Sequence, residues 1–239
     1  MNIFLAGASG VVGRRLVPML RDAGHVVTGT TRSPEKAAAL AALGAKGVVV
    51  DVYDARALLQ AMNAAHPDVV IHQLTDLPDT IDPKVYPAAL ARNARVRTEG
   101  TPNLVNAALF IGTRRLIAQS VAFGYDPAAK SPADETAPLD QSEARRVLVD
   151  GMLALEKAVT KSPELEAVIL RYGYFYGPGT WNAAPVPPAV HVDAAAHAAL
   201  LAVSRGEPGV YNIAEDDGVV SSEKAKRELG FDPAYRLMR

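Results

Sequence analysis

Three glycines at three-residue spacing, Gly7, Gly10 and Gly13, follow a short apolar run near the start of the chain. Apolar residues then continue at helical spacing, which indicates a buried strand, a glycine turn and a helix. The free N–H groups and the dipole of such a helix N-terminus favour an anion, and glycine lets the backbone approach it closely. We therefore predict a dinucleotide pyrophosphate above this turn, the alternative being a purely structural tight turn. The residues expected to bind the dinucleotide here are Gly7, Ser9, Gly10, Val11, Val12 and Gly13.

The end of the second predicted strand, residues 26–30, bears on which dinucleotide binds. Thr30, Thr31 and Arg32 stand at this point, with no acidic residue among them. An acid would bind the ribose 2′-hydroxyl of NAD, whereas a guanidinium suits the 2′-phosphate of NADP. We predict NADP, bound through Arg32 with Arg14 able to join it, while NAD stays possible. The alternative is that both arginines are solvated surface residues.

Short apolar runs alternate with helical patterns along most of the chain. This alternation predicts right-handed βαβ units and hence an α/β, Rossmann-type doubly wound parallel sheet with helices on both faces. Residues 1–171 would form the dinucleotide-binding domain. Residues 172–239 would form a small substrate-binding part, intertwined with the first in a single compact unit. The expected strands are 3–5, 26–30, 47–52, 69–74, 115–119, 167–171 and 209–213, and the main expected helices are 34–43, 55–65, 85–111, 143–161, 193–204 and 221–229.

Several motifs occur in order over almost the whole chain. They are GASGVVG at 7–13, DVYD at 51–54, EGTPNLVNAA at 99–108, RRLIAQS at 114–120, LRYGYFYGPGT at 170–180, VHVDAAAHAAL at 190–200 and GVYNIAE at 209–215. Together they resemble the extended or atypical short-chain dehydrogenase/reductases, the NAD(P)-dependent epimerase/dehydratase family. Between 181 and 190, and between 218 and 221, the chain is shorter than such proteins usually are.

The resemblance implies further cofactor contacts and a homodimer. Asp51 corresponds to an acid that binds the adenine amino group, although it could equally cap a helix, and Val52 would pack near the adenine ring. The backbone of Leu74 and Thr75 would pass the cofactor ribose. Family dimers pair the helices expected at 85–111 and 143–161; their alanine-rich faces would allow this, or could simply reflect composition.

The family's catalytic residues are only partly present. Family members use a tyrosine as acid or base, a lysine four residues later, and a serine that orients the substrate carbonyl. Ser120 supplies the serine at the end of the fifth strand. If Glu156 matches the glutamate that ends the family motif, Leu148 and Met152 take the places of the tyrosine and the lysine. Neither can move a proton.

Other residues could substitute for the missing pair. We predict Tyr125, in the loop after Ser120, as the acid, with Ser120 polarising the substrate oxygen. Arg97, on the long helix, could replace the lysine charge beside the cofactor, and Tyr172 should border the same pocket. The alternatives are tyrosines that only pack and an arginine that lies on the surface. His72, on a buried strand, is predicted to be a satisfied core histidine.

Composition excludes several classes of function. The chain has 239 residues, 25 basic and 26 acidic side chains, and no cysteine. The near-neutral charge gives no reason to expect nucleic acid, and no apolar run approaches the roughly 20 residues that span a bilayer. Disulfide and thiolate chemistry are excluded, and no residue cluster has metal-ligand spacing. A cytoplasmic protein is therefore expected.

The leading hypothesis is an NAD(P)-dependent oxidoreductase of the atypical short-chain type, which transfers hydride between nicotinamide and a small carbonyl or hydroxyl substrate. Loss of the tyrosine–lysine pair motivates an alternative, a non-catalytic NADP-binding redox sensor or scaffold. A further alternative is an epimerase or dehydratase of the sugar-nucleotide type that recycles its cofactor within each turnover.

Overall fold

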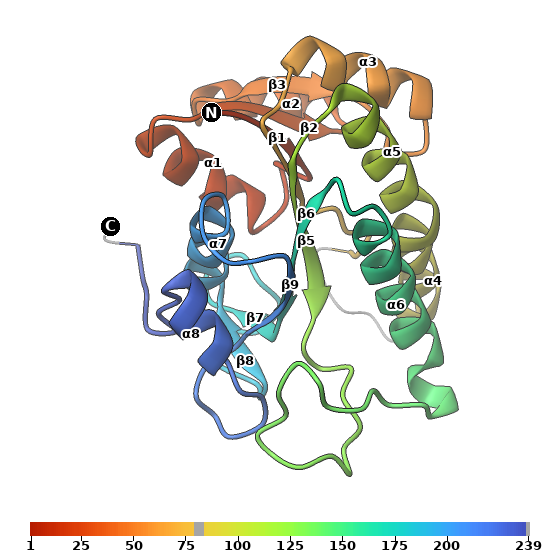
Figure 1. Ribbon diagram of the computed structural model, residues 1–239, viewed down its shortest axis with the longest axis vertical. Coiled ribbons are helices and arrows are strands. Elements are labelled where there is room, and N and C mark those ends of the chain that lie inside the picture. The colour runs from red at the N-terminus through yellow and green to blue at the C-terminus, as the bar shows by residue number, and fades with distance from the viewer. Residues whose placement is uncertain (79–83, 238–239) are drawn as a thin grey trace.

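A parallel sheet forms the centre of the computed structural model, which describes residues 1–78 and 84–237 (Figure 1). Each strand of this sheet runs parallel to its neighbours. The strand order reverses direction between β1 and β4, which confirms the predicted doubly wound α/β fold. From one edge to the other the strands are β3 (Lys46–Val49), β2 (Val26–Thr31), β1 (Asn2–Ala6), β4 (Val69–His72), β5 (Arg115–Val121), β6 (Glu166–Tyr172) and β9 (Gly209–Ile213).

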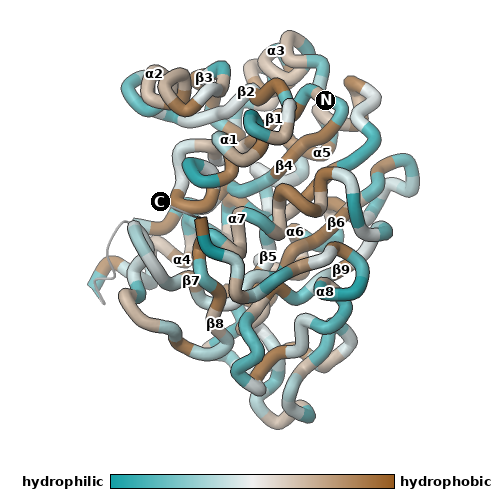
Figure 2. Tube along the Cα trace, turned by 90° about the vertical axis from the view of Figure 1, so that its left-hand side faces the viewer, coloured by the Kyte–Doolittle hydropathy of each residue, from teal (hydrophilic) through white to brown (hydrophobic). Residues whose placement is uncertain are grey.

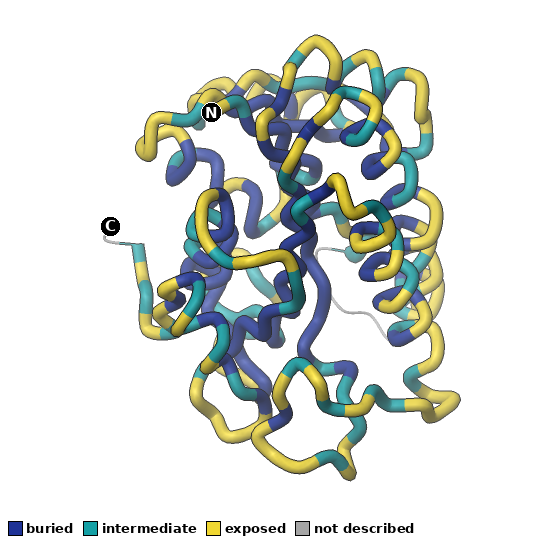
Figure 3. The backbone as a smooth tube through the Cα atoms, viewed as in Figure 1, coloured by how far each residue is buried: buried dark blue, intermediate teal, exposed yellow. Residues whose placement is uncertain are grey.

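Helices cover both faces of the sheet, and each face has its own hydrophobic cluster. Figure 3 shows the strands between them as buried over most of their length, and Figure 2 shows hydrophobic residues along β1, β4 and β6. The sheet is therefore apolar on both sides, as parallel strands require. One face carries α1 (Gly13–Asp22), α2 (Pro34–Ala42) and α7 (Val192–Leu201), and the other carries α3 (Ala55–Ala65), α5 (Thr101–Ile111) and α6 (Arg146–Thr160).

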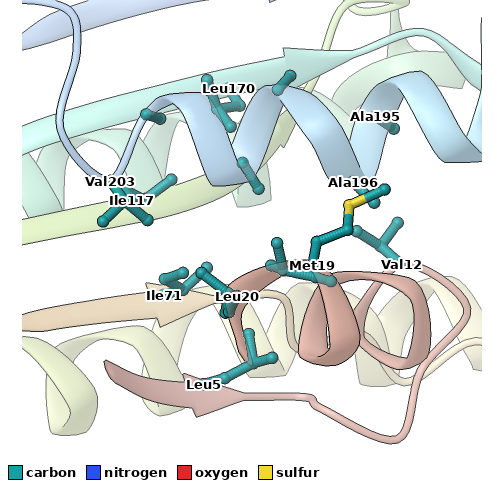
Figure 4. Packing of buried hydrophobic residues seen from close by; sticks show 14 of the residues in the cluster. Leu5, Val12, Met19, Leu20, Ile71, Ile117, Leu170, Ala195, Ala196 and Val203 are labelled. Carbon is teal, nitrogen blue, oxygen red and sulfur yellow. The ribbon is translucent and has the colours of Figure 1, made fainter. Parts of the chain in front are cut away.

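Alanines let α7 approach α1 closely. Ala195 and Ala196 of α7 are fully buried, and Met19 of α1 points toward Ala196 (Figure 4). Leu20 of α1 packs against Ile71 of the sheet in the same cluster. This packing holds the start of α1, and with it the glycine turn, at the carboxyl ends of the central strands.

Two helix starts form as their cap residues predict. The Ser33 hydroxyl accepts a hydrogen bond from the Lys36 N–H at 3.2 Å, and Pro34 follows as the first residue of α2. Asp54 caps α3 in the same way through the Ala57 N–H at 2.9 Å. The third strand is shorter than expected and ends at Val49.

The expected helix 85–111 is interrupted by a π-helical turn. It consists of α4 (Tyr86–Arg95), the turn Val96–Gly100, and α5. The backbone N–H of Thr101 donates to the Val96 carbonyl five residues earlier, and the Thr101 hydroxyl donates to the same carbonyl at 3.3 Å. This i→i+5 bond widens the helix, and Pro102, which follows, has no N–H for the regular ladder.

The C-terminal third belongs to the same sheet and core as the rest. The expected loop 172–188 contains β7 (Tyr174–Tyr176), which pairs in parallel with β8 (Ala189–His191). β9 then joins β6 as an edge strand of the main sheet, and α8 (Glu223–Leu229) packs beside it. In residues 1–78 and 84–237, no helix is long and apolar enough to cross a membrane.

Candidate active site

A cavity of about 1070 Å³ lies at the C-terminal ends of the central strands, where open α/β sheets bind ligands. The glycine turn and the ends of β2, β4, β5 and β6 line it. Every residue predicted to bind the cofactor lies in its wall: Gly7, Ser9, Gly10, Val11, Val12, Gly13, Arg32, Asp51, Val52, Leu74, Thr75, Arg97 and Tyr172. The structure therefore brings together residues that are far apart in the sequence.

The glycine turn leaves the start of α1 open to the cavity. Gly7 has φ +87°, and a Cβ there would lie 2.5 Å from the Gln73 carbonyl oxygen. A side chain at Gly13 would collide with the carbonyl of Gly7. No side chain caps α1 in the described structure. The turn thus forms a backbone cradle at a helix N-terminus, which fits a pyrophosphate.

Three cations of the dinucleotide-binding half line the cavity. Arg32 and Lys36 come from the segment after β2, and Arg14 comes from the first turn of α1, where its guanidinium lies close to Gly179. Arg32 Nη2 lies 3.2 Å from Asp76 Oδ1, and this hydrogen bond raises the pKa of Arg32. Lys36 is not among the residues predicted from the sequence, although the Ser33-Pro34 helix start places it in the first turn after β2.

A buried ion pair holds the Ser120 side chain. The Ser120 hydroxyl donates to Glu156 Oε1 at 2.7 Å. Arg171 binds the same carboxylate through two N–H groups, at 2.8 and 2.7 Å. Burial opposes the charge of Arg171, but the contacts with Glu156 outweigh it and raise the pKa of Arg171. Ser120 therefore offers the cavity lone pairs rather than a proton, which argues against its expected role in polarising a carbonyl oxygen.

Tyr125 lies away from the cavity, contrary to the expectation. Its hydroxyl donates to Asn212 Oδ1 at 2.7 Å and accepts from Arg171 Nη1 at 2.9 Å. Burial raises the pKa of Tyr125, and its ring packs on a separate small cluster that includes Ala122. Among the described residues that line the cavity, Tyr125 is absent. The chain turns away from the site after β5, so the structure does not support Tyr125 as the acid.

In the structure, too, the positions of the family's tyrosine and lysine hold only apolar side chains. Leu148 lines the cavity, and Met152, one turn later on α6, is fully buried. Arg97 reaches the same place from the π-helical turn, and its Nη1 donates to the Leu148 carbonyl at 3.4 Å. Gly151 of α6 lies beside the Arg97 side chain, where a Cβ would be in van der Waals contact with Arg97 Cδ at 3.4 Å.

Arg97 is a buried cation that faces the cavity. Arg97 is 6% exposed, and burial lowers its pKa to about 10, so it stays charged at neutral pH. No carboxylate in the described structure lies within ion-pairing distance of it. A guanidinium has five N–H donors, so most of those of Arg97 remain available to a ligand.

His72 is a structural residue, as predicted. Its Nδ1 accepts from the Leu74 N–H at 3.2 Å, so the proton is on Nε2, which donates to the Thr101 hydroxyl at 2.9 Å. Burial, with a smaller contribution from Arg97, lowers the pKa of His72 to about 4. The neutral ring thus connects the end of β4 to the π-helical turn that carries Arg97.

Tyr172 and Tyr174, at and after the end of β6, line the cavity. Tyr172 is fully buried, and its hydroxyl accepts from Gln73 Nε2 at 3.3 Å. Burial raises the pKa of Tyr172, which makes it a weak proton donor. The Tyr174 ring stacks on Phe123 with centroids 4.0 Å apart.

No group of three His, Asp or Glu side chains in the described ranges could hold a metal ion.

Comparison with known proteins identifies the family. A model described as the NAD dependent epimerase/dehydratase family matches residues 3–190. The chain belongs to this family. The 3-diazoavenalumate denitrifying reductase of a Streptomyces species, a relative in it, is 38% identical over 263 aligned positions, covering 99% of this chain and 84% of that protein. The alignment is longer than the 239 residues of this chain, so the relative carries segments that this chain lacks.

Solved structures of epimerases share the fold of this family member. UDP-glucose 4-epimerase of Thermotoga maritima, with UDP-glucose, superposes with a TM-score of 0.82 at 18% identity, over 99% of this chain and 94% of that one. The UDP-glucose 4-epimerase of Thermus thermophilus, in complex with NAD, gives 0.80 at 21% identity, over 99% and 95%. The resemblance drawn from the sequence motifs is confirmed, and the protein is an NAD(P)-dependent oxidoreductase of the atypical short-chain type.

We expect the stability of the protein to fall as pH is lowered from about 6.5 to about 4, in part through His72. In this range the unfolded chain protonates this histidine and the folded protein does not. The loss is at most about 1.4 kcal/mol per pH unit for one proton. Urea unfolding at several pH values gives the free energy of unfolding as a function of pH. The slope of this free energy against pH should be shallower for His72→Asn than for the wild type. His66→Asn, at an exposed histidine, should keep the wild-type slope; equal slopes in all three proteins would contradict this role of His72.

Proposed function

We propose that the protein is an NADP(H)-dependent reductase whose hydride acceptor needs no proton from the enzyme. The observation that carries the proposal is the apolar pair Leu148 and Met152, beside a Ser120 whose proton is directed to Glu156. The diazo group named for the 38% identical relative is an acceptor of this kind. Reductive removal of a diazo group from a small substrate is therefore the reaction we propose.

The residues of the cavity fit a dinucleotide. The backbone at Gly7 to Gly13 would hold the pyrophosphate, and Asp51 and Val52 would face the adenine. Arg97 would bind near the nicotinamide ribose, in place of the family's lysine. When bound, the reduced nicotinamide supplies a hydride.

The charge balance of the two candidate reactions favours the diazo group. Reduction of a carbonyl leaves an alkoxide, which needs a proton from an acid such as the family's tyrosine. An aryl diazonium that accepts hydride forms a C–H bond while its C–N bond breaks, and the C–N electron pair leaves on neutral dinitrogen. No proton is required. Leu148 makes the first reaction difficult and leaves the second unaffected.

A carbonyl reductase with a relocated acid remains the second candidate. Tyr174 supports it, because this tyrosine lines the cavity where Tyr125 does not. A redox sensor without turnover would be the third outcome of the experiment below.

The reaction is tested with 4-carboxybenzenediazonium and NADPH deuterated on one face of C4. We expect dinitrogen release and benzoate with deuterium at the vacated ring position. Reduction without enzyme is the background, and only the enzymatic reaction should use one face of the cofactor. The rate should change less than about twofold in D₂O and less than about threefold in Tyr174→Phe, since acid catalysis is worth about 10²–10⁴.

Other outcomes decide between the candidates. Turnover of a carbonyl panel that is lost in Tyr174→Phe would establish the carbonyl reductase instead. Tight NADPH binding without turnover of the diazonium or of any carbonyl would overturn the reductase and favour the sensor.

NADP rather than NAD is the cofactor we propose, because Arg32 and Lys36, from the segment after β2, both line the cavity. Arg32→Ala should weaken NADPH binding about tenfold or more, since hydrogen bonds to charged groups are worth about 1.5–3 kcal/mol. NADH binding should change less than about twofold in a fluorescence titration. Arg21→Ala, an exposed arginine outside the cavity, is the matched control. Equal weakening of both dinucleotides by Arg32→Ala would remove Arg32 from 2′-phosphate recognition.

We also propose that residues 1–171 form the cofactor-binding part and residues 172–239 the substrate-binding part.

A homodimer through the helices at 85–111 and 143–161 is a further proposal. Leu153 on α6 is 43% exposed although it is large and apolar, which supports burial against a second copy. Sedimentation should show a dimer that Leu153→Glu weakens at least tenfold. Val186→Glu, an exposed apolar residue outside both helices, should leave it intact. A monomeric wild type would contradict the dimer.

A further inference from the structure

The acidic side chains that line the cavity in the described ranges lie in its adenosine half. In the part of the chain that the structure describes, the carboxylates that line the cavity are Asp51 and Asp76. Both follow strands of the dinucleotide-binding half, and Asp76 is already paired with Arg32. Among the described residues, the half that remains for a substrate therefore has cations and no carboxylate to balance them.

Aromatic rings line this substrate half. Phe123 and Tyr174 stack at an interplanar angle of 9°. Trp181 meets Tyr86 edge to face at 6.3 Å, and its indole N–H donates to the Pro78 carbonyl at 2.9 Å, which fixes the ring. All four rings belong to the wall of the cavity. Flat rings on the walls favour a flat, aromatic ligand.

Arg145 adds a positive charge to the same half. It lies in the short turn Glu143–Arg145 directly before α6, and it lines the cavity half-buried. Within residues 1–78 and 84–237, no carboxylate is within ion-pairing distance of it. Its neighbour Arg146 is exposed and does not line the cavity.

The start of α6 reinforces this charge. α6 runs for 15 residues from Arg146, and no side chain of the described residues caps its N-terminus. The partial positive charge of that N-terminus adds to the charge of Arg145. Arg97, 6% exposed and with most of its N–H groups unbonded, supplies a second and independent cation deeper in the cavity.

We propose that the substrate is an aromatic carboxylate, and that Arg145 binds its carboxylate group. The ring lies among Phe123, Tyr174 and Trp181, with the reacting carbon directed toward Ser120 and Arg97. This inference rests on the proposed function for the identity of the site, and it adds the chemical class of the substrate and a residue that selects it.

The test compares cinnamate with cinnamamide, which has the same shape without the charge. Isothermal titration of the protein saturated with NADP⁺ should show cinnamate binding at least tenfold more tightly than the amide. Arg145→Met should reduce that ratio to less than about threefold, and Arg145→Lys should keep part of it. Arg146→Met is the matched control, and the wild-type ratio is expected for it.

Each outcome has a definite meaning, because binding is measured without turnover. Equal binding of acid and amide by the wild type, or an unchanged ratio in Arg145→Met, would overturn this inference. A protein that prefers the acid but reduces neither a diazonium nor a carbonyl would overturn the proposed function and leave this inference standing. Loss of both ligands in a misfolded Arg145→Met is recognised by its NADP⁺ affinity, and Arg145→Lys then decides.

Discussion

The bidentate pair between Glu156 and Arg171 is the interaction on which the active-site arrangement depends. It joins α6 to β6 where both side chains are buried, so removal of either partner would leave an uncompensated charge. The same two side chains also determine what their neighbours can do. Glu156 accepts the hydrogen bond of the Ser120 hydroxyl, and Arg171 holds the hydroxyl of Tyr125 away from the cavity. One structural ion pair thus removes two groups from acid catalysis.

The remaining chemistry of the site follows from this constraint. With no proton donor at Leu148, the cavity can still orient ligands, exclude water and hold charge. Arg97 supplies a fixed positive charge close to where the family's lysine would be, but as a guanidinium it is unsuited to exchange protons. Such a site is matched to reactions whose leaving group departs without protonation. It is poorly matched to reactions that pass a proton back and forth.

Local signals were sufficient for the parts of the fold that depend on adjacent residues. The glycine turn, the Ser33-Pro34 start and the Asp54 cap each depend on three or four neighbouring residues, and they form as predicted. Ser120 shows the opposite case. Its partner Glu156 lies 36 residues away, so the direction of its proton is decided only when α6 packs on the sheet. The position of Tyr125 depends in the same way on Arg171 and Asn212.

The π-helical turn acts as a phase shift in the long helix. The buried residues 89, 93, 97, 101 and 105 recur every four positions, although an α-helix repeats every 3.6. A regular helix would rotate about 40° between successive members of this series, which would place Ala89 about 160° from Val105. The extra residue of the π-helical turn takes up about 100° of this difference. A deletion of one residue between 96 and 100 would turn all of α4 by about 100° relative to α5. The length of this short segment, as much as its composition, therefore determines which side chains of the long helix face the cavity.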